Sequence, residues 1–313
     1  MKIRFTIFPR VHTGSPIPLF SLPMYIFRVV LVLGATQFIA GQGMSQTIWH
    51  GLHTGGMNYQ GELRDRNLTL QGSRWLQGTN IILVSPAGFH VSVNYTYGML
   101  SGQDVENDRY VTRRRNLHFE TNFHEFSIMG RQRLGRTRTT LLSPYFAAGA
   151  ALFRINPYTY DAIGKKWALF PLSTEGQGLS AYPGIWSTGH FFLSVPMGVG
   201  VEVKVSRHLR ADIEFLARKT FTDRIDDVSG RYPDENLLLS AKGFKAVELS
   251  YRADELLYES PYFPAEGTLR GNPATKDNYY SLQISCRYLL RTWSNPIERV
   301  RYLFRGADWP YRF

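Results

Sequence analysis

Between Thr47 and Arg291 the chain alternates apolar and polar residues with a period of two, and segments with helical periodicity are scarce. Such alternation predicts β-strands, because successive side chains of a strand point to opposite faces of a sheet. The clearest examples lie within 89–99, 193–205, 211–218 and 280–288. One face of each is apolar or aromatic, whereas the other carries Gly, Ser, Asn or charged residues of both signs. The pattern therefore predicts an all-β fold.

Eight strands are predicted from this alternation and from the turn residues between them. They lie at about 47–60, 78–85, 88–101, 116–133, 142–156, 190–205, 209–222 and 278–290. Several are about 10–14 residues long, against a usual length of about 5–6. In the fourth strand the apolar face changes near His124 and Glu125, which predicts a β-bulge there.

The connections between these strands alternate in length. The short ones lie at 86–87, 135–141 and 206–208, and the long ones at 61–77, 102–115, 157–189 and 223–277. Strict alternation is typical of membrane barrels, which have short periplasmic turns at one end and long external loops at the other. We therefore predict an eight-stranded antiparallel up-and-down transmembrane β-barrel with both termini in the periplasm. The pattern alone leaves open a soluble exported binding barrel, whose apolar faces would form a core.

The two ends of the chain differ from the barrel. Residues 1–46 carry four basic residues, no acidic residue and an apolar run from Val29 to Ala40, which together predict an N-terminal extension with an export signal peptide. A single N-terminal membrane anchor is the alternative. Residues 47–291 are the predicted barrel, and 292–313 a basic periplasmic tail. In the tail, Asn295 and Pro296 can begin a short helix. Its apolar face would dock on a partner, fold back on the barrel rim or lie at the inner lipid face, through Ile297, Val300, Leu303 and Phe304.

Composition excludes several other classes of protein. Apart from the N-terminus, no run of about 20 apolar residues occurs, which argues against a polytopic helical membrane protein. The single cysteine, Cys286, excludes an internal disulfide framework and a multi-cysteine metal site. Its predicted place is on the apolar face of the last strand. There it would face lipid or form a disulfide with another chain.

Charged residues gather on the polar faces of the sixth and seventh predicted strands. They are Glu202, Lys204, Arg210, Asp212, Glu214 and Arg218. Side chains just fill the interior of an eight-stranded barrel, and unpaired buried charges are costly. These six residues are therefore predicted to pair and plug the lumen. An open pore and a catalytic lumen with an acid–base pair of carboxylates are the less favoured alternatives.

Two other clusters contain residue types that can bind metal ions. On the fourth strand, His118, Glu120, Asn122 and His124 share one face, but neighbouring members are about 6.8 Å apart. This spacing does not suit adjacent ligands of one ion, so we expect a hydrogen-bond network in the lumen instead. At the start of the last long loop, Asp223, Asp226 and Asp227 are weak calcium candidates. Loop capping is the favoured interpretation, and no cofactor or catalytic residue is expected.

A series of short motifs runs through roughly 47–290 in a fixed order. They are Asn58-Tyr59-Gln60-Gly61-Glu62-Leu63, Arg115-Asn116-Leu117-His118-Phe119, Ser143-Pro144-Tyr145 with Phe153 to Pro157, Thr174-Glu175-Gly176-Gln177-Gly178, Pro196-Met197-Gly198-Val199-Gly200, Arg218-Lys219-Thr220-Phe221-Thr222-Asp223, Asp226-Asp227-Val228-Ser229, Arg270-Gly271-Asn272 and Asn278-Tyr279-Tyr280. In these motifs the chain resembles the Bacteroidota outer-membrane β-barrel family that includes PorG of the type IX secretion system.

The resemblance implies a non-enzymatic barrel in the cell outer membrane. Such a barrel would anchor the periplasmic ring of a type IX secretion and gliding machinery. Its partners would be outer-membrane lipid, a ring lipoprotein and a ring subunit, with no nucleic acid and no small-molecule substrate. An outer-membrane enzyme that uses loop or lumen-rim residues is the alternative from another functional class.

Overall fold

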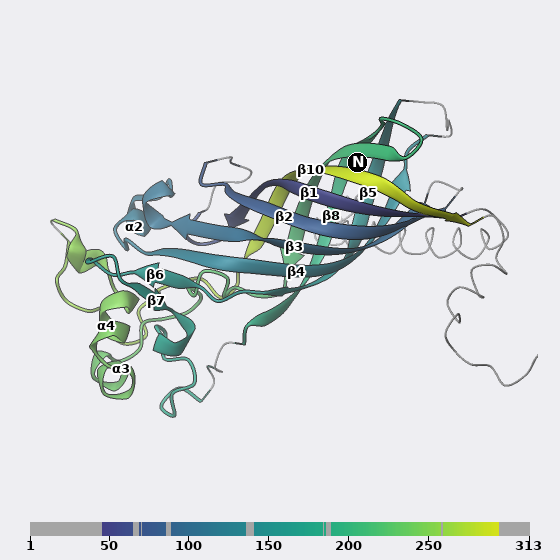
Figure 1. Ribbon diagram of the computed structural model, residues 1–313. Helices are drawn as coiled ribbons and strands as arrows, with labels where there is room; N and C mark the ends of the chain where they lie inside the picture. The colour runs from purple at the N-terminus through teal and green to yellow at the C-terminus, as the bar shows by residue number, and fades with distance from the viewer. Residues whose placement is uncertain are drawn as a thin grey trace, which may run out of the picture.

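Eight long strands form one closed antiparallel barrel in the computed structural model (Figure 1). The structure describes residues 46–293 except 65–68, 70, 86–88, 136–140, 184, 186–188 and 258. The barrel strands are β1 (Gln46–Gln60), β2 (Arg74–Val84), β3 (Phe89–Gln103), β4 (His118–Arg133), β5 (Leu142–Arg154), β8 (Phe191–Lys204), β9 (Leu209–Thr220) and β10 (Asn278–Trp293). Each strand pairs with the next, and β10 pairs with β1 to close the ring. The predicted barrel and the order of its strands are confirmed.

The short and long connections lie at opposite ends of the barrel, as predicted. The turn between β8 and β9 is held where the Val205 N–H donates to the Leu209 carbonyl at 3.1 Å. The long loops carry the other elements of the described residues, which gather at the end of the barrel opposite the short turns, the loop end (Figure 1). These are η2 (Asp104–Glu106), α2 (Tyr110–Arg113), β6 (Tyr158–Tyr160), β7 (Lys166–Ala168), η3 (Phe170–Leu172), α3 (Glu235–Lys242), α4 (Phe244–Ser250) and η4 (Ala253–Glu255). Among the described residues, no helix is long and apolar enough to cross a bilayer. The predicted signal segment before Gln46 and the predicted tail helix fall outside the described residues.

The β-bulge expected in β4 is absent. Residues 118–132 pair with β3 in one unbroken register, and 124–133 do the same with β5. The prediction of a bulge near His124 and Glu125 was therefore wrong. The register instead shifts between Ile48 and Trp49, where β1 pairs with β10.

The same face of β4 points inward along the whole strand, and it is the polarity of the inward-facing residues that changes. Phe119, Phe123 and Glu125 are all buried and point inward, as does Arg131 near the short turns. The even-numbered residues point outward along the whole strand, which places the face of His118, Glu120, Asn122 and His124 outside the barrel. The prediction that these four form a lumen network was therefore wrong.

The interior has two layers of different chemistry. The half of the barrel nearer the long loops, the loop half, encloses an apolar core. Its buried residues are Met57, Tyr59, Leu63, Leu76, Leu100, Leu117, Phe119, Phe123, Phe153, Ile155, Leu169, Ile225, Val228 and Tyr279. The half nearer the short turns, the turn half, has a mostly polar interior, with a small apolar cluster around Met129 and Leu216. Its buried polar residues include Asn80, His90, Ser92, Asn94, Ser127, Arg131, Glu202, Asp212, Glu214, Ser285 and Arg287.

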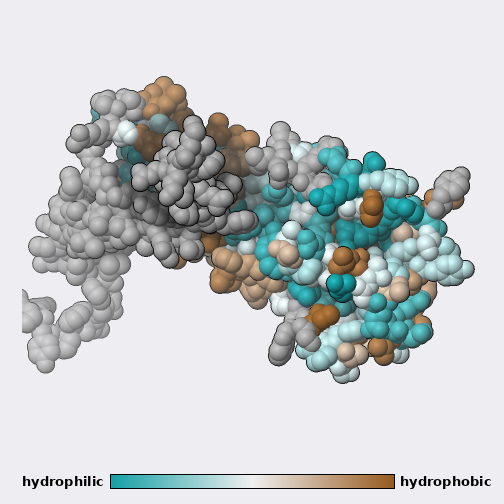
Figure 2. Space-filling view, turned by 180° about the vertical axis from the view of Figure 1, so that it is seen from behind, coloured by the Kyte–Doolittle hydropathy of each residue, from teal (hydrophilic) through white to brown (hydrophobic). Residues whose placement is uncertain are grey.

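Around the turn half, the outer wall is apolar and exposed. It carries Leu52, Ile81, Val93, Phe126, Ile128, Phe146, Leu152, Leu193, Val199, Val201, Ile213, Leu282, Ile284 and Leu290. Figure 2 shows apolar surface on the barrel and a largely hydrophilic surface on the loop end. Exposed apolar residues outside and buried charges inside are the distribution of a transmembrane β-barrel, because lipid replaces water as the outer solvent.

Candidate functional site

Glu202 of β8 is the centre of an ion-pair cluster near the short turns. Its carboxylate accepts hydrogen bonds from Arg133 of β4, from Arg210 of β9 at 3.1 Å and from Arg287 of β10 at 2.9 Å. Only 4% of Glu202 is exposed. One carboxylate thus joins strands on opposite sides of the lumen.

Two further carboxylates on β9 extend this cluster toward the middle of the barrel. The Tyr145 hydroxyl lies 2.9 Å from Asp212 and 2.8 Å from Glu214. Arg287 also pairs with Asp212, and Arg131 pairs with Glu214 at 3.0 Å. These charges are buried and paired, as charges in a low-dielectric interior must be if they are to stay ionised.

A third group lies directly below the apolar core. The Arg218 guanidinium pairs with Glu125 at 3.3 Å, and the Tyr279 hydroxyl donates to the same carboxylate at 2.6 Å. Arg218 also donates to the Leu216 carbonyl at 3.1 Å. Both members of the ion pair have side chains that are 2% exposed. This layer separates the polar lumen from the apolar core.

The structure brings five of the six predicted plug residues into this lumen cluster. Lys204 is the exception, because it is exposed at the turn end and has no ion pair among the described residues. Sequence reasoning missed Glu125, Arg131, Arg133 and Arg287. The inward parity of Arg287 was visible in the alternation of β10. The parity of the three β4 residues was hidden by the expected bulge.

Several of the motifs that carry the family resemblance meet at the loop end, where they form a second buried network. The motifs at 143–145 and 196–200 lie within β5 and β8 instead. Glu175 accepts from the backbone N–H groups of Ser229 at 2.8 Å and Gly230 at 3.0 Å, and from Arg270 at 3.1 Å. Asp227 accepts from the Thr174 hydroxyl at 2.7 Å. Motifs about 50–95 residues apart therefore hold one another in place.

Backbone packing explains two of the motif glycines. A Cβ on Gly61 would lie 1.9 Å from the Tyr59 hydroxyl, and one on Gly271 would lie 2.8 Å from the Ser229 nitrogen. Neither position has room for a side chain, because Gly61 packs against the Tyr59 and Asp277 side chains and Gly271 packs against the Ser229 backbone.

Two buried carboxyl groups share the hydroxyl of Tyr59, 2.5 Å from Asp226 and 3.0 Å from Asp277. Burial raises the pKa of Asp277 to about 8. Burial and then the charge of Asp277 raise the pKa of Asp226 well above its usual value. The pair therefore holds a proton at neutral pH and fixes the start and end of the last long loop against β1.

The three aspartates considered for calcium have separate partners. Asp223 pairs with Lys276 at 3.5 Å, while Asp226 and Asp227 lie in the contacts described above. Within the part of the chain that the structure describes, no group of three or more His, Cys, Asp or Glu side chains is arranged to hold a metal ion. These carboxylates serve the packing of the loops.

A polar cleft of about 970 Å³ lies beside the loop-end network. Arginines line much of it, but carboxylates neutralise several of them. Arg115 pairs with Asp104 at 2.6 Å, and Arg114 pairs with Glu259 at 2.5 Å. The cleft is thus less basic than its lining suggests.

Cys286 lies on the outer face of β10, opposite Leu52 of β1, and its side chain is exposed. The predicted place on the apolar face is correct. Since the chain has one cysteine, any disulfide would join it to another molecule.

No protein-family model and no curated protein match this chain. Among solved structures, it is similar to Neisserial surface protein A, with 10% identity over 79% of this chain and 99% of that chain and a TM-score of 0.37. The N-terminal β-barrel domain of Pseudomonas aeruginosa OprF has 11% identity over 78% and 100%, with a TM-score of 0.34. Ail, the attachment invasion locus protein of Yersinia pestis, has 9% identity over 79% and 99%, with a TM-score of 0.35.

The closed ring of strands, the paired charges inside and the apolar wall outside define the class of protein. This chain is an eight-stranded transmembrane β-barrel with a filled lumen and an ordered loop end.

Proposed function

We propose that this protein is a non-enzymatic barrel of the outer membrane that acts as an anchor and scaffold, and not as a channel. The observation that carries the proposal is the filled lumen. Five arginines and four carboxylates pair across it, and an apolar core lies above them. A solute would have to break buried ion pairs to pass.

The loop end supports a contact role better than a catalytic one. Its acidic pair, Asp226 and Asp277, is the arrangement that an acid–base enzyme would use. Both side chains are at most 2% exposed and are held by Tyr59, so a substrate has no access to them. The buried network instead gives the loops one fixed shape, which suits binding between macromolecules.

We further propose that the scaffold serves the periplasmic ring of a type IX secretion and gliding machinery. The support is the ordered set of sequence motifs, together with the topology. Gln46 and Trp293 pair at the turn end, so the segments before β1 and after β10 both leave the barrel there. If the long loops face outward from the cell, both termini lie in the periplasm. The apolar tail residues Ile297, Val300, Leu303 and Phe304 would then reach a ring lipoprotein or ring subunit.

A pull-down from the native envelope tests this proposal. The tagged full-length barrel is compared with a deletion of 294–313, which leaves β10 whole, and with a variant whose four apolar tail residues are serine. A matched control changes Glu298, Arg299 and Arg301 to alanine. Ring proteins should co-purify with the full-length barrel and the control, and be lost from the other two. Heat-modifiable mobility in electrophoresis monitors folding in each case.

Two results would contradict the proposal. A folded full-length barrel that recovers no ring component would reject the type IX role. A barrel released by an alkaline wash into the soluble fraction would reject the membrane location and favour the soluble binding barrel.

A further inference from the structure

Two neighbouring rows of outward-facing residues cross five strands in register. The upper row, nearer the loop end, consists of Thr54, Gln77, Tyr97, His124 and Arg154. The lower row consists of Leu52, Thr79, Tyr95, Phe126 and Leu152. The upper row is largely polar and ends in a charge, whereas the lower row is mostly apolar. The boundary between a polar headgroup zone and hydrocarbon has this chemistry.

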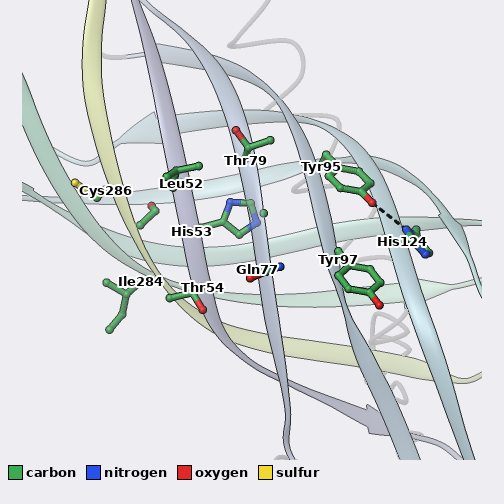
Figure 3. A pocket seen from close by; sticks show the side chains of 12 residues that line it. Leu52, His53, Thr54, Gln77, Thr79, Tyr95, Tyr97, His124, Ile284 and Cys286 are labelled. Atoms are coloured by element: carbon green, nitrogen blue, oxygen red, sulfur yellow. Dashed lines mark hydrogen bonds between the residues drawn. The ribbon is translucent and has the colours of Figure 1, made fainter.

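The wall is hollowed along these rows. A groove of about 790 Å³ runs from Ile284 and Cys286 across β1 and β2 to Tyr95 and His124. Figure 3 shows Thr79 between Leu52 and Tyr95, and Gln77 between Thr54 and Tyr97. A second hollow of about 510 Å³ adjoins it, because both are lined by Tyr95 and His124. The second hollow also contacts Phe126, Leu152, Arg154 and Phe191.

The polar end of this groove carries hydrogen-bond donors that point to an anion. Arg154 is exposed, and its guanidinium has no hydrogen bond or ion pair with any residue that the structure describes. It lies opposite His124 in the pairing of β4 and β5. The hydroxyl of Tyr95 lies 2.9 Å from Nδ1 of His124 (Figure 3). In a neutral ring, a hydroxyl that donates to Nδ1 leaves the N–H on Nε2.

We propose that this groove is a binding site for one phosphate-bearing membrane lipid of the leaflet nearer the loop end. The phosphate would bind Arg154 and His124, since a guanidinium matches phosphate in charge and geometry. An acyl chain would lie along the lower row, over Tyr95 and Thr79 toward Leu52. The charge at one end and the apolar floor at the other both match a phospholipid. The inference requires that the barrel lies in a membrane, but it does not depend on the scaffold role.

The test measures lipid binding to the purified full-length barrel in a neutral detergent. The probe is dioleoyl phosphatidylglycerol, titrated while native mass spectrometry reports the lipid-bound fraction. Dioleoylglycerol has the same chains without the phosphate and serves as the ligand control. We expect one saturable phosphatidylglycerol site and much weaker binding of dioleoylglycerol.

Two variants address opposite ends of the groove. R154Q removes the charge and should weaken phosphatidylglycerol binding at least about tenfold, the effect of one charge-assisted hydrogen bond. Q77W fills the groove without removing a hydrogen bond among the described residues, and it should weaken binding to a similar degree. The matched control is K219Q, which removes an exposed charge from the outer face of β9 and should leave the affinity within about twofold.

Several outcomes would overturn the proposal. Folded R154Q and Q77W with unchanged affinity would show that the groove does not hold the lipid. Equal losses in R154Q and K219Q would indicate general charge attraction. Tight binding of dioleoylglycerol would exclude recognition of the phosphate. Displacement of the lipid by inorganic phosphate would identify a free-anion site instead. If R154Q does not fold, as judged by heat-modifiable mobility, Q77W with K219Q as control still decides the question.

Discussion

Breaking the Arg218–Glu125 ion pair should be far more costly than removing both of its charges. The two groups lie 3.3 Å apart with side chains 2% exposed, so water cannot replace either partner. At an effective dielectric constant of about 20, two unit charges at this distance attract by about 5 kcal/mol. In R218M the Glu125 carboxylate keeps only the Tyr279 hydroxyl. We expect a loss of about 3–5 kcal/mol of unfolding free energy.

The double variant E125Q/R218M should be more stable than R218M alone, because it leaves no uncompensated charge in the barrel. The assay is urea-induced unfolding in lipid vesicles, followed by tryptophan fluorescence and electrophoretic mobility. R114M is the control, since Arg114 and Glu259 form a pair at the loop surface, where water screens the attraction between the two charges. An R218M barrel within about 1 kcal/mol of the native protein would refute this reasoning. Additive effects of E125Q and R218M would refute it as well.

Three other properties follow from the same interior and surface. In a planar bilayer, the purified barrel should show almost no conductance, and a steady large current would disprove the plug formed by the lumen charges. The folded loop end binds a proton at Asp277, whose pKa is raised to about 8, while the unfolded chain releases it near pH 4. The stability of the loop end should thus be fully present below pH 4 and decline up to about pH 8. D277N should flatten this dependence in hydrogen exchange of residues 223–277, and an unchanged slope would exclude Asp277 as its source. In membranes, Cys286 should react with an uncharged maleimide but not with a sulfonated one, and equal rates would place it outside the lipid.

The strands could be predicted from sequence because a barrel in lipid keeps the alternation of period two clean. In β9, Ala211, Ile213 and Phe215 alternate with Arg210, Asp212 and Glu214, and the structure places the two sets outside and inside. The predicted and observed strands differ only at their ends, as in β2, which begins at Arg74 and not at residue 78. Apolar side chains on the lipid face and charges in the lumen do not exchange places without a large cost.

The partners of the charged residues could not be predicted in the same way. Glu214 pairs with Arg131, 83 residues earlier, and the Tyr59 hydroxyl contacts Asp226, 167 residues later. Such contacts depend on which strands are neighbours and on their stagger around the barrel. Alternation fixes the face of a residue but not its height. The motifs mark the positions near 59, 175, 227 and 270, but they do not indicate which of these residues are in contact.

The wrong prediction of a bulge in β4 has a physical cause, because the barrel wall is in contact with lipid along one part and with water along another. Across β1 to β4, the interior changes from polar to apolar at the height where the outer wall changes from apolar to polar. In β4, Glu125 and Phe123 point inward on either side of His124, which belongs to the outer polar row. In β3, Thr96 and Leu100 likewise lie below and above the level of Tyr97. Within the bilayer the outer wall already faces an apolar solvent, so an apolar interior gains no free energy from the hydrophobic effect. Polar groups can therefore fill the lumen there and specify which strands pair. Beyond the membrane the wall meets water, and only an apolar interior there gains from the hydrophobic effect. The same strands thus form a barrel with a polar lumen within the bilayer and a barrel with an apolar core, as in water-soluble proteins, beyond it. The apolar core gives the loop end a stable base outside the bilayer.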